Sequence, residues 1–140
     1  MMPQASHGPK DEFTIDTDEE SGVAVITMVA RITGQRLVCA LDALAGHEGY
    51  RAVQPRLWDF RDADLSQLTR AELRLVARHV RSLELSPPES RAGVLVSRDV
   101  DFGVVRMFEL TEAESLSGGV RAFRDLSRAQ AWLLGADAED

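Results

Sequence analysis

A short apolar run that ends in alternating acids and arginines lies in the middle of the chain, at residues 55–65. Residues 56–60 are typical of a β-strand, and residues 69–72 after them have the Thr-x-x-Glu spacing of a capping box that opens a helix. A buried strand that passes through a polar turn into an amphipathic helix is the repeating step of an α/β domain. The segment therefore predicts an α/β fold with residues 56–60 as a central strand.

Four more stretches have the character of strands. Residues 12–17 alternate between apolar and polar side chains, as an edge strand does. Residues 23–30 and 92–96 are apolar on both faces, which is typical of interior strands, and residues 120–123 form the fifth candidate. The polar turn at residues 18–22 joins the first two strands as a hairpin.

Four helices are expected between and after these strands. Thr33 is a suitable N-cap for a helix over residues 34–45, and the capping box opens a second helix that runs to about residue 85. A third is expected over residues 100–114, and Ser127-Arg128-Ala129-Gln130 resembles a capping box for a short last helix. The order β-β-α-β-α-β-α-β-α predicts a five-stranded mixed sheet, with an antiparallel hairpin followed by parallel strands.

The two strands that are apolar on both faces have a consequence for the layers of the fold. Right-handed crossovers between neighbouring strands place most helices on one side of the sheet. The opposite face then needs a cover, since exposed apolar patches of that size are uncommon. A helix, a terminal segment or a second copy of the chain would each serve, so a homodimer stays open as an alternative.

Composition limits the class of protein. The 140 residues fit one domain, expected over 11–134, between a disordered leader at 1–10 and an acidic tail at 135–140. No apolar run approaches the roughly 20 residues that span a bilayer, and the first ten residues lack the apolar core of a signal peptide. We therefore expect no transmembrane segment and a cytoplasmic location.

Charge and motifs exclude several functions. A net charge of −7 opposes nucleic acid as a partner, because phosphate binding requires clustered cations. The sequence has none of the glycine-rich, nucleophile-elbow or paired-histidine motifs that bind nucleotides, build hydrolases or hold zinc. We therefore predict no cofactor and a protein that is not an enzyme.

Several stretches together resemble the SpoIIAA-like branch of the STAS (anti-sigma-factor antagonist) superfamily, also described as STAS/SEC14-like. The similar stretches are Leu57-Trp58-Asp59-Phe60-Arg61, Leu68-Thr69-Arg70-Ala71-Glu72-Leu73, Ala92-Gly93-Val94-Leu95-Val96-Ser97, Phe102-Gly103-Val104-Val105-Arg106-Met107 and Val120-Arg121-Ala122-Phe123-Arg124-Asp125. The resemblance covers about residues 12–134. It implies a five-stranded mixed sheet with helices and a regulatory, protein-binding role.

The same resemblance implies a candidate phosphorylation site. In the proteins that define the superfamily, a serine that directly follows an aspartate, at the start of the helix after the third strand, is phosphorylated and controls binding to a kinase. Here the corresponding loop, residues 62–69, has no Asp-Ser pair. Ser66 and Thr69 are its only hydroxyls, and Thr69 is already expected as a helix cap, which leaves Ser66 as the candidate.

A charged rim is expected at the carboxyl ends of the parallel strands, where ligands usually bind in open α/β sheets. Its members are Asp59, Arg61, Asp62, Asp64, Ser97, Arg98, Asp99, Asp101, Arg124 and Asp125. The acids have the chemistry to hold a divalent cation, and they also suit helix capping and pairing with the arginines. We favour pairing, and so predict no metal site.

Arg106 lies on the otherwise apolar third helix. A guanidinium there needs an acceptor, because an unpaired buried charge is costly. Glu109, three residues on, and Asp59 across the helix-sheet interface are the candidate acceptors, and an anionic ligand is the functional alternative.

Three functions follow from these features. We favour a non-catalytic regulatory module that binds a protein partner through the rim and the helix at 100–114. The alternative is a carrier of a small apolar or anionic ligand, suggested by the SEC14-like resemblance and by the apolar third helix beside Trp58. A metal-assisted hydrolase that uses the aspartates is the third.

Overall fold

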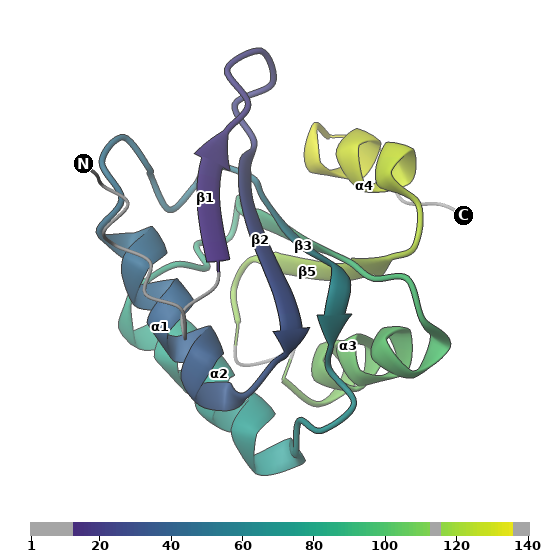
Figure 1. The fold of residues 1–140 in the computed structure, drawn as a ribbon. Helices are drawn as coiled ribbons and strands as arrows, with labels where there is room; N and C mark the ends of the chain where they lie inside the picture. Colours follow the sequence, from purple (N-terminus) through teal and green to yellow (C-terminus); the bar gives the residue numbers. More distant parts are fainter. Residues whose placement is uncertain (1–12, 113–115, 136–140) are drawn as a thin grey trace, which may run out of the picture.

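Within the residues that the structure describes, nine elements follow one another in the predicted order, β-β-α-β-α-β-α-β-α (Figure 1). The structure is a computed structural model, and it describes residues 13–112 and 116–135. The leader expected at 1–10 and residues 136–140 of the expected tail lie outside these ranges. Across the described ranges, no helix combines the length and apolar character needed to cross a bilayer.

The bounds of the elements agree closely with the sequence pattern. The strands are β1 (Phe13–Thr17), β2 (Ala24–Arg31), β3 (Arg56–Asp64), β4 (Arg91–Leu95) and β5 (Gly119–Phe123). The helices are α1 (Gly34–Ala45), α2 (Arg70–Ser82), α3 (Asp99–Glu112) and α4 (Leu126–Leu133). The second helix is shorter than expected, because Glu84 takes a left-handed backbone conformation (φ 57°) that ends the helical path before Leu85.

The five strands form one sheet in the order β1-β2-β3-β4-β5. The first two strands are antiparallel, with Phe13 opposite Met28, and every other neighbouring pair is parallel. The predicted mixed sheet is therefore confirmed. Because each strand pairs with the next one in the chain, β3 is the middle strand, as its apolar run indicated.

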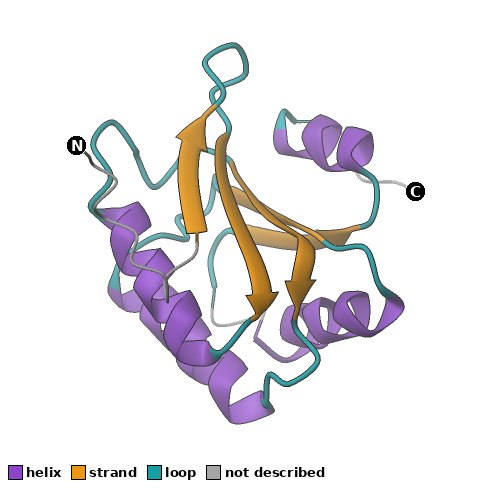
Figure 2. Ribbon diagram, viewed as in Figure 1, coloured by secondary structure: helices purple, strands orange, loops and turns teal. Residues whose placement is uncertain are grey.

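The sheet has helices on both faces (Figures 1 and 2). On one face, α1, α2 and α3 cover the larger core, in which Ile26, Met28 and Leu44 are fully buried beside Trp58 and Phe60. Ile26 and Met28 of β2, like Trp58 and Phe60 of β3, occupy alternate strand positions, as the two-residue period of a strand requires. The larger core lies between this sheet face and the three helices.

A second, smaller core lies on the opposite face of the sheet. Val23, Leu57 and Leu95 pack there against Ala129 and Leu133 of α4. Figure 1 shows α4 set apart from the other three helices, on this side of the sheet. Of the three covers considered for the second apolar face, a helix is therefore the one found over β3, β4 and β5.

Two of the predicted helix caps are confirmed and one is wrong. Thr33 Oγ1 accepts the backbone N–H of Arg36 at 3.1 Å, and Thr69 and Glu72 form the reciprocal capping box of α2. The box predicted at residues 127–130 does not form. The last helix begins at Leu126, its N-cap is Asp125, and no side chain caps it.

The middle strand continues four residues beyond the predicted end at Phe60. A register shift on β3 places Thr27 of β2 opposite Asp59 but Val29 opposite Asp62, so one extra residue bulges from β3. Pairing then resumes, with Ala63 opposite Ala30. Backbone pairing with β2 thus keeps an acidic, arginine-containing stretch extended, although its composition indicated a turn.

Candidate functional site

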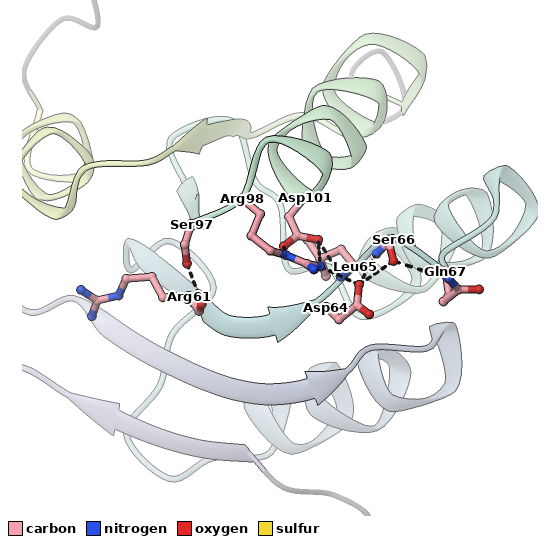
Figure 3. Close-up of polar contacts among 8 residues, drawn as sticks. All are labelled: Arg61, Asp64, Leu65, Ser66, Gln67, Ser97, Arg98 and Asp101. Carbon is pink, nitrogen blue, oxygen red and sulfur yellow. Dashed lines mark hydrogen bonds and ion pairs between the residues drawn. The ribbon is translucent and has the colours of Figure 1, made fainter.

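Two aspartates and one arginine form a cluster where β3 ends and α3 begins (Figure 3). Arg98 donates from Nε to Oδ2 of Asp101 at 2.8 Å and from Nη2 to Oδ1 of Asp101 at 3.0 Å. The same Nη2 donates to Oδ1 of Asp64 at 2.7 Å. Hydrogen bonds to Asp101 and then Asp64 raise the pKa of Arg98, which therefore stays charged. The two-pronged contact with Asp101 is a strong geometry for an arginine-carboxylate pair.

Asp101 is almost completely buried, with 1% of its surface exposed. Its Oδ1 also accepts the backbone N–H of Leu65 at 2.8 Å. A buried carboxylate is tolerated when it is paired and hydrogen-bonded, and Asp101 has both kinds of contact. It therefore ties the first turn of α3 to the residue that follows β3, which is a structural role.

The carboxylate of Asp64 is held by Ser66 and by Arg98. Its Oδ1 accepts the Ser66 hydroxyl at 2.6 Å and the Ser66 backbone N–H at 2.9 Å. These two bonds, followed by the contact with Arg98, lower the pKa of Asp64 to about 2. A carboxylate with so low a pKa is poorly suited to general acid-base catalysis near neutral pH.

Asp59 and Arg61 pair with each other, away from this cluster. Arg61 donates to Asp59 from Nε at 3.0 Å and from Nη2 at 2.9 Å, and these hydrogen bonds lower the pKa of Asp59. Asp59 shares its sheet face with Leu57 and Leu95, on the α4 side. Figure 3 shows the Arg61 side chain pointing away from Asp64 and Arg98.

Two further predicted residues are Ser97 and Asp62. Ser97, just after β4, donates its hydroxyl to the backbone carbonyl of Arg61 at 2.6 Å, which joins β4 to β3. Asp62 is exposed beside the bulge. The expected rim is therefore split, because β3 continues to Asp64 and leaves Asp59 and Arg61 within the strand.

Arg106 and Arg124 each pair with an acid of α3. Arg106 Nη1 lies 2.8 Å from Glu109 Oε1, as one of the sequence alternatives proposed, and Asp59 does not take part in this pair. Arg124 Nη1 lies 2.5 Å from Asp99 Oδ1. Its guanidinium carbon also sits 5.8 Å from the centre of the Phe102 ring, within the range of a cation-π contact.

The aspartates were also considered as ligands of a divalent cation. In the part of the chain that the structure describes, no three His, Cys, Asp or Glu side chains converge as a metal site would require. The carboxylates of Asp59, Asp64 and Asp101 instead face arginines. The metal-assisted hydrolase therefore finds no support in the described residues.

Part of the outward surface of α3 is apolar, which is unusual for a solvent-facing helix. Val100, Met107 and Leu110 are 48%, 38% and 75% exposed, and their spacing places them with Gly103 on one side of the helix. We call these four residues the α3 stripe. The inward residues Val104 and Val105 contact the larger core.

The overall arrangement is similar to that of a solved protein. A crystal structure of an uncharacterized protein of the DUF3478 family from Shewanella loihica PV-4, described as having a SpoIIAA-like fold, superposes with a TM-score of 0.56. The alignment covers 86% of this chain and 91% of that one, at 15% sequence identity. This chain has a SpoIIAA-like fold. No protein-family model and no curated protein matches the sequence.

Ser66, the phosphorylation site predicted from the sequence, lies between β3 and α2. Ser66 is exposed there, and its hydroxyl donates to Asp64. The helix itself begins later, at Arg70, with Thr69 as its cap. Phosphorylation of Ser66 stays a prediction, and a phosphate there would have to displace the contact with Asp64.

Sequence reasoning missed one part of this SpoIIAA-like fold. A cavity of about 110 Å³ lies between the sheet and the helices α1 to α3, and Trp58, Val94 and Phe108 are among its lining residues. Arg56, the first residue of β3, also lines the cavity and is only 4% exposed. The available signal was the strand alternation, which places Arg56 on the same inward face as Trp58 and Phe60.

Proposed function

We propose that this SpoIIAA-like chain is a non-catalytic regulatory module that binds a protein partner through the α3 stripe. The observation that carries the proposal is the exposure of three large apolar side chains on one side of one helix. Exposed apolar side chains grouped on one side of a helix, on a chain otherwise rich in charge, are typical of an interaction site. The fold supports the regulatory class, since the superfamily it resembles consists of such modules.

Three arginines lie near the stripe and are proposed as the polar edge of the contact surface. Arg98 and Arg124 lie at the amino-terminal end of α3 and Arg106 lies on the helix, and each is about half exposed. Each is already paired with an acid of this chain. The pair of Arg124 with the exposed Asp99 contributes only about 0–1 kcal/mol, so a partner carboxylate can replace Asp99 at little cost, whereas Arg98 stays paired with the buried Asp101.

The proposed partner is a different protein, and not a second copy of this chain. A net charge of −7 on each molecule makes two copies repel, whereas a partner with a positively charged surface is attracted. The stripe itself adds no charge, so it supplies apolar contact area while the net charge disfavours self-association.

The test compares two leucines that are both exposed on helices. The tagged chain is used to isolate its partner, and the affinity of the purified pair is then measured for wild type, Leu110→Asp on α3 and Leu75→Asp on α2. Burying a leucine contributes about 1.5–3 kcal/mol, so we expect Leu110→Asp to weaken binding about 10- to 100-fold.

The control variant Leu75→Asp should change the affinity less than about twofold, because Leu75 is 46% exposed on a different helix. Both variants should unfold within about 0.5 kcal/mol of wild type, as expected for surface substitutions. Equal weakening by both variants, or by neither, would refute the α3 stripe as the contact surface.

A second candidate function is favoured by one observation. The apolar cavity between the sheet and α1 to α3 is comparable in size to engineered cavities of about 150 Å³ that bind benzene-sized molecules. Val104 and Phe108 of α3 line it together with Trp58, so the apolar helix faces this cavity as well as solvent. We propose carriage of a small apolar ligand as the alternative function.

A further inference from the structure

Arg56 is a buried arginine, and its hydrogen-bond partners among residues 13–112 and 116–135 are uncharged groups. Its Nη1 donates to Tyr50 Oη at 3.0 Å, to the Ala52 carbonyl at 3.2 Å and to the Gln54 carbonyl at 3.4 Å. Its Nη2 donates to the Leu85 carbonyl. These contacts fix the guanidinium at the amino-terminal end of β3 but do not neutralise its charge.

A guanidinium this deeply buried usually has a negatively charged partner, and Arg56 has none among the described residues. None of the ion pairs formed by the described residues includes Arg56. Tyr50 does not supply a negative charge at neutral pH, because burial raises the pKa of its phenol. Burial also lowers the pKa of Arg56, which means that the surroundings disfavour the charge they contain. Buried charges are normally paired with an opposite charge.

Arg56 is also one of the residues that line the apolar cavity described above. Leu85 and Ala92 line the cavity at the Arg56 end of β3, and Phe60 and Leu65 line it toward the other end of the strand. Four residue steps of a strand span about 13 Å. The cavity is therefore an apolar space whose lining includes one buried arginine at one end.

We propose that this cavity binds a small amphipathic carboxylate, whose anionic head pairs with Arg56 and whose hydrocarbon part lies among the apolar side chains. The inference rests on the second candidate function, carriage of a small ligand, and adds the charge and orientation of that ligand. A carboxylate matches the planar guanidinium and supplies the negative charge that the described residues do not.

The experiment compares octanoate with 1-octanol, which has the same chain length and no charge at neutral pH. The chain has two tryptophans, of which Trp58 lines the cavity and Trp132 packs on the α4 side. Trp132→Phe leaves Trp58 as the only tryptophan, so its fluorescence reports binding in the cavity. Titrations stay below the concentration at which octanoate forms micelles, and native mass spectrometry gives the stoichiometry.

We expect one octanoate per chain, bound about 10- to 100-fold more tightly than 1-octanol, because charged hydrogen bonds add that much affinity. Arg56→Met should remove this preference and Arg56→Lys should keep most of it, since lysine retains the charge. Val94→Phe, made at the strand position beside Trp58, should fill the cavity and abolish octanoate binding without loss of stability. This variant serves as the test if Arg56→Met does not fold.

The outcomes separate the inference from the function on which it rests. If 1-octanol binds as tightly as octanoate, the anionic ligand is wrong and the small-ligand carrier stands. If neither binds, both are wrong. Octanoate binding that survives Val94→Phe unchanged would place the ligand outside the cavity and would also overturn the inference.

Discussion

Ser66 controls the acid-base behaviour of Asp64. The two hydrogen bonds from Ser66 are the largest cause of the low pKa of Asp64, about 2, compared with the ordinary value of 3.8. A carboxyl whose pKa is lower in the folded state stabilises the fold above its unfolded pKa. That contribution is lost as the pH falls from about 4 to about 2.

Replacing Ser66 with alanine removes the hydroxyl bond and keeps the backbone one, so it should raise the pKa of Asp64 part of the way from about 2 toward 3.8. An NMR titration of the side-chain carboxyl carbon measures this directly. Ser97→Ala is the matched control, because the Ser97 hydroxyl contacts the Arg61 carbonyl and not Asp64. A Ser66→Ala variant whose Asp64 still titrates near pH 2 would contradict the assignment of the cause.

The contacts of Arg56 and Arg106 show which side-chain partners can be predicted from the sequence and which cannot. Strand alternation places Arg56 inward, but its acceptor at Leu85 comes from a loop 29 residues away and depends on how α2 ends. The partner of Arg106 was easier to predict, because Glu109 lies three residues away on the same helix, a spacing that brings side chains together. Partners within one helix can be predicted from spacing, whereas partners brought by tertiary packing cannot.

Among the elements, α4 answers a question that the sequence left open, namely what covers the second apolar face of the sheet. It covers the second apolar face of the sheet, and Leu133 is its most deeply placed large side chain, at 4% exposure. The next residue, Leu134, is 56% exposed. The two adjacent leucines therefore allow a matched comparison.

Leu133→Ala should lower the free energy of unfolding by about 2–5 kcal/mol, because it opens a cavity in the smaller core. Leu134→Ala should change it by less than about 0.5 kcal/mol. Urea unfolding followed by circular dichroism measures both. Equal losses would mean that α4 does not pack on the sheet as described.

The errors at element level have definite causes. The last helix begins at Leu126, soon after β5 and directly after the N-cap Asp125. Residues 127–130 therefore lie inside the helix and do not form the expected capping box. The end of β3 was missed because its last residues are held by pairing with β2, and that register is not encoded in the composition of β3 itself. Long apolar and amphipathic segments, in contrast, were placed within a few residues.

For the whole molecule, the alternation of strands and helices was sufficient to predict the mixed five-stranded sheet, and the resemblance of several stretches implied its SpoIIAA-like arrangement. The charged residues at the strand ends were also expected to pair, and Asp64, Arg98 and Asp101 do so. The α3 stripe and the cavity needed the structure. Helical apolarity alone does not tell which side chains face the core and which face solvent.

The account depends most on the claim that the α3 stripe contacts a protein partner. Site-specific cross-linking tests it directly: Cys39, the single cysteine, is replaced by serine, and one new cysteine is introduced by Leu110→Cys or, as a control, Leu75→Cys. With a short cysteine-reactive cross-linker, the account predicts a covalent complex with a different protein from position 110 and none from position 75. Cross-linking from position 75 alone, equally from both positions, or only to a second copy of this chain would contradict it.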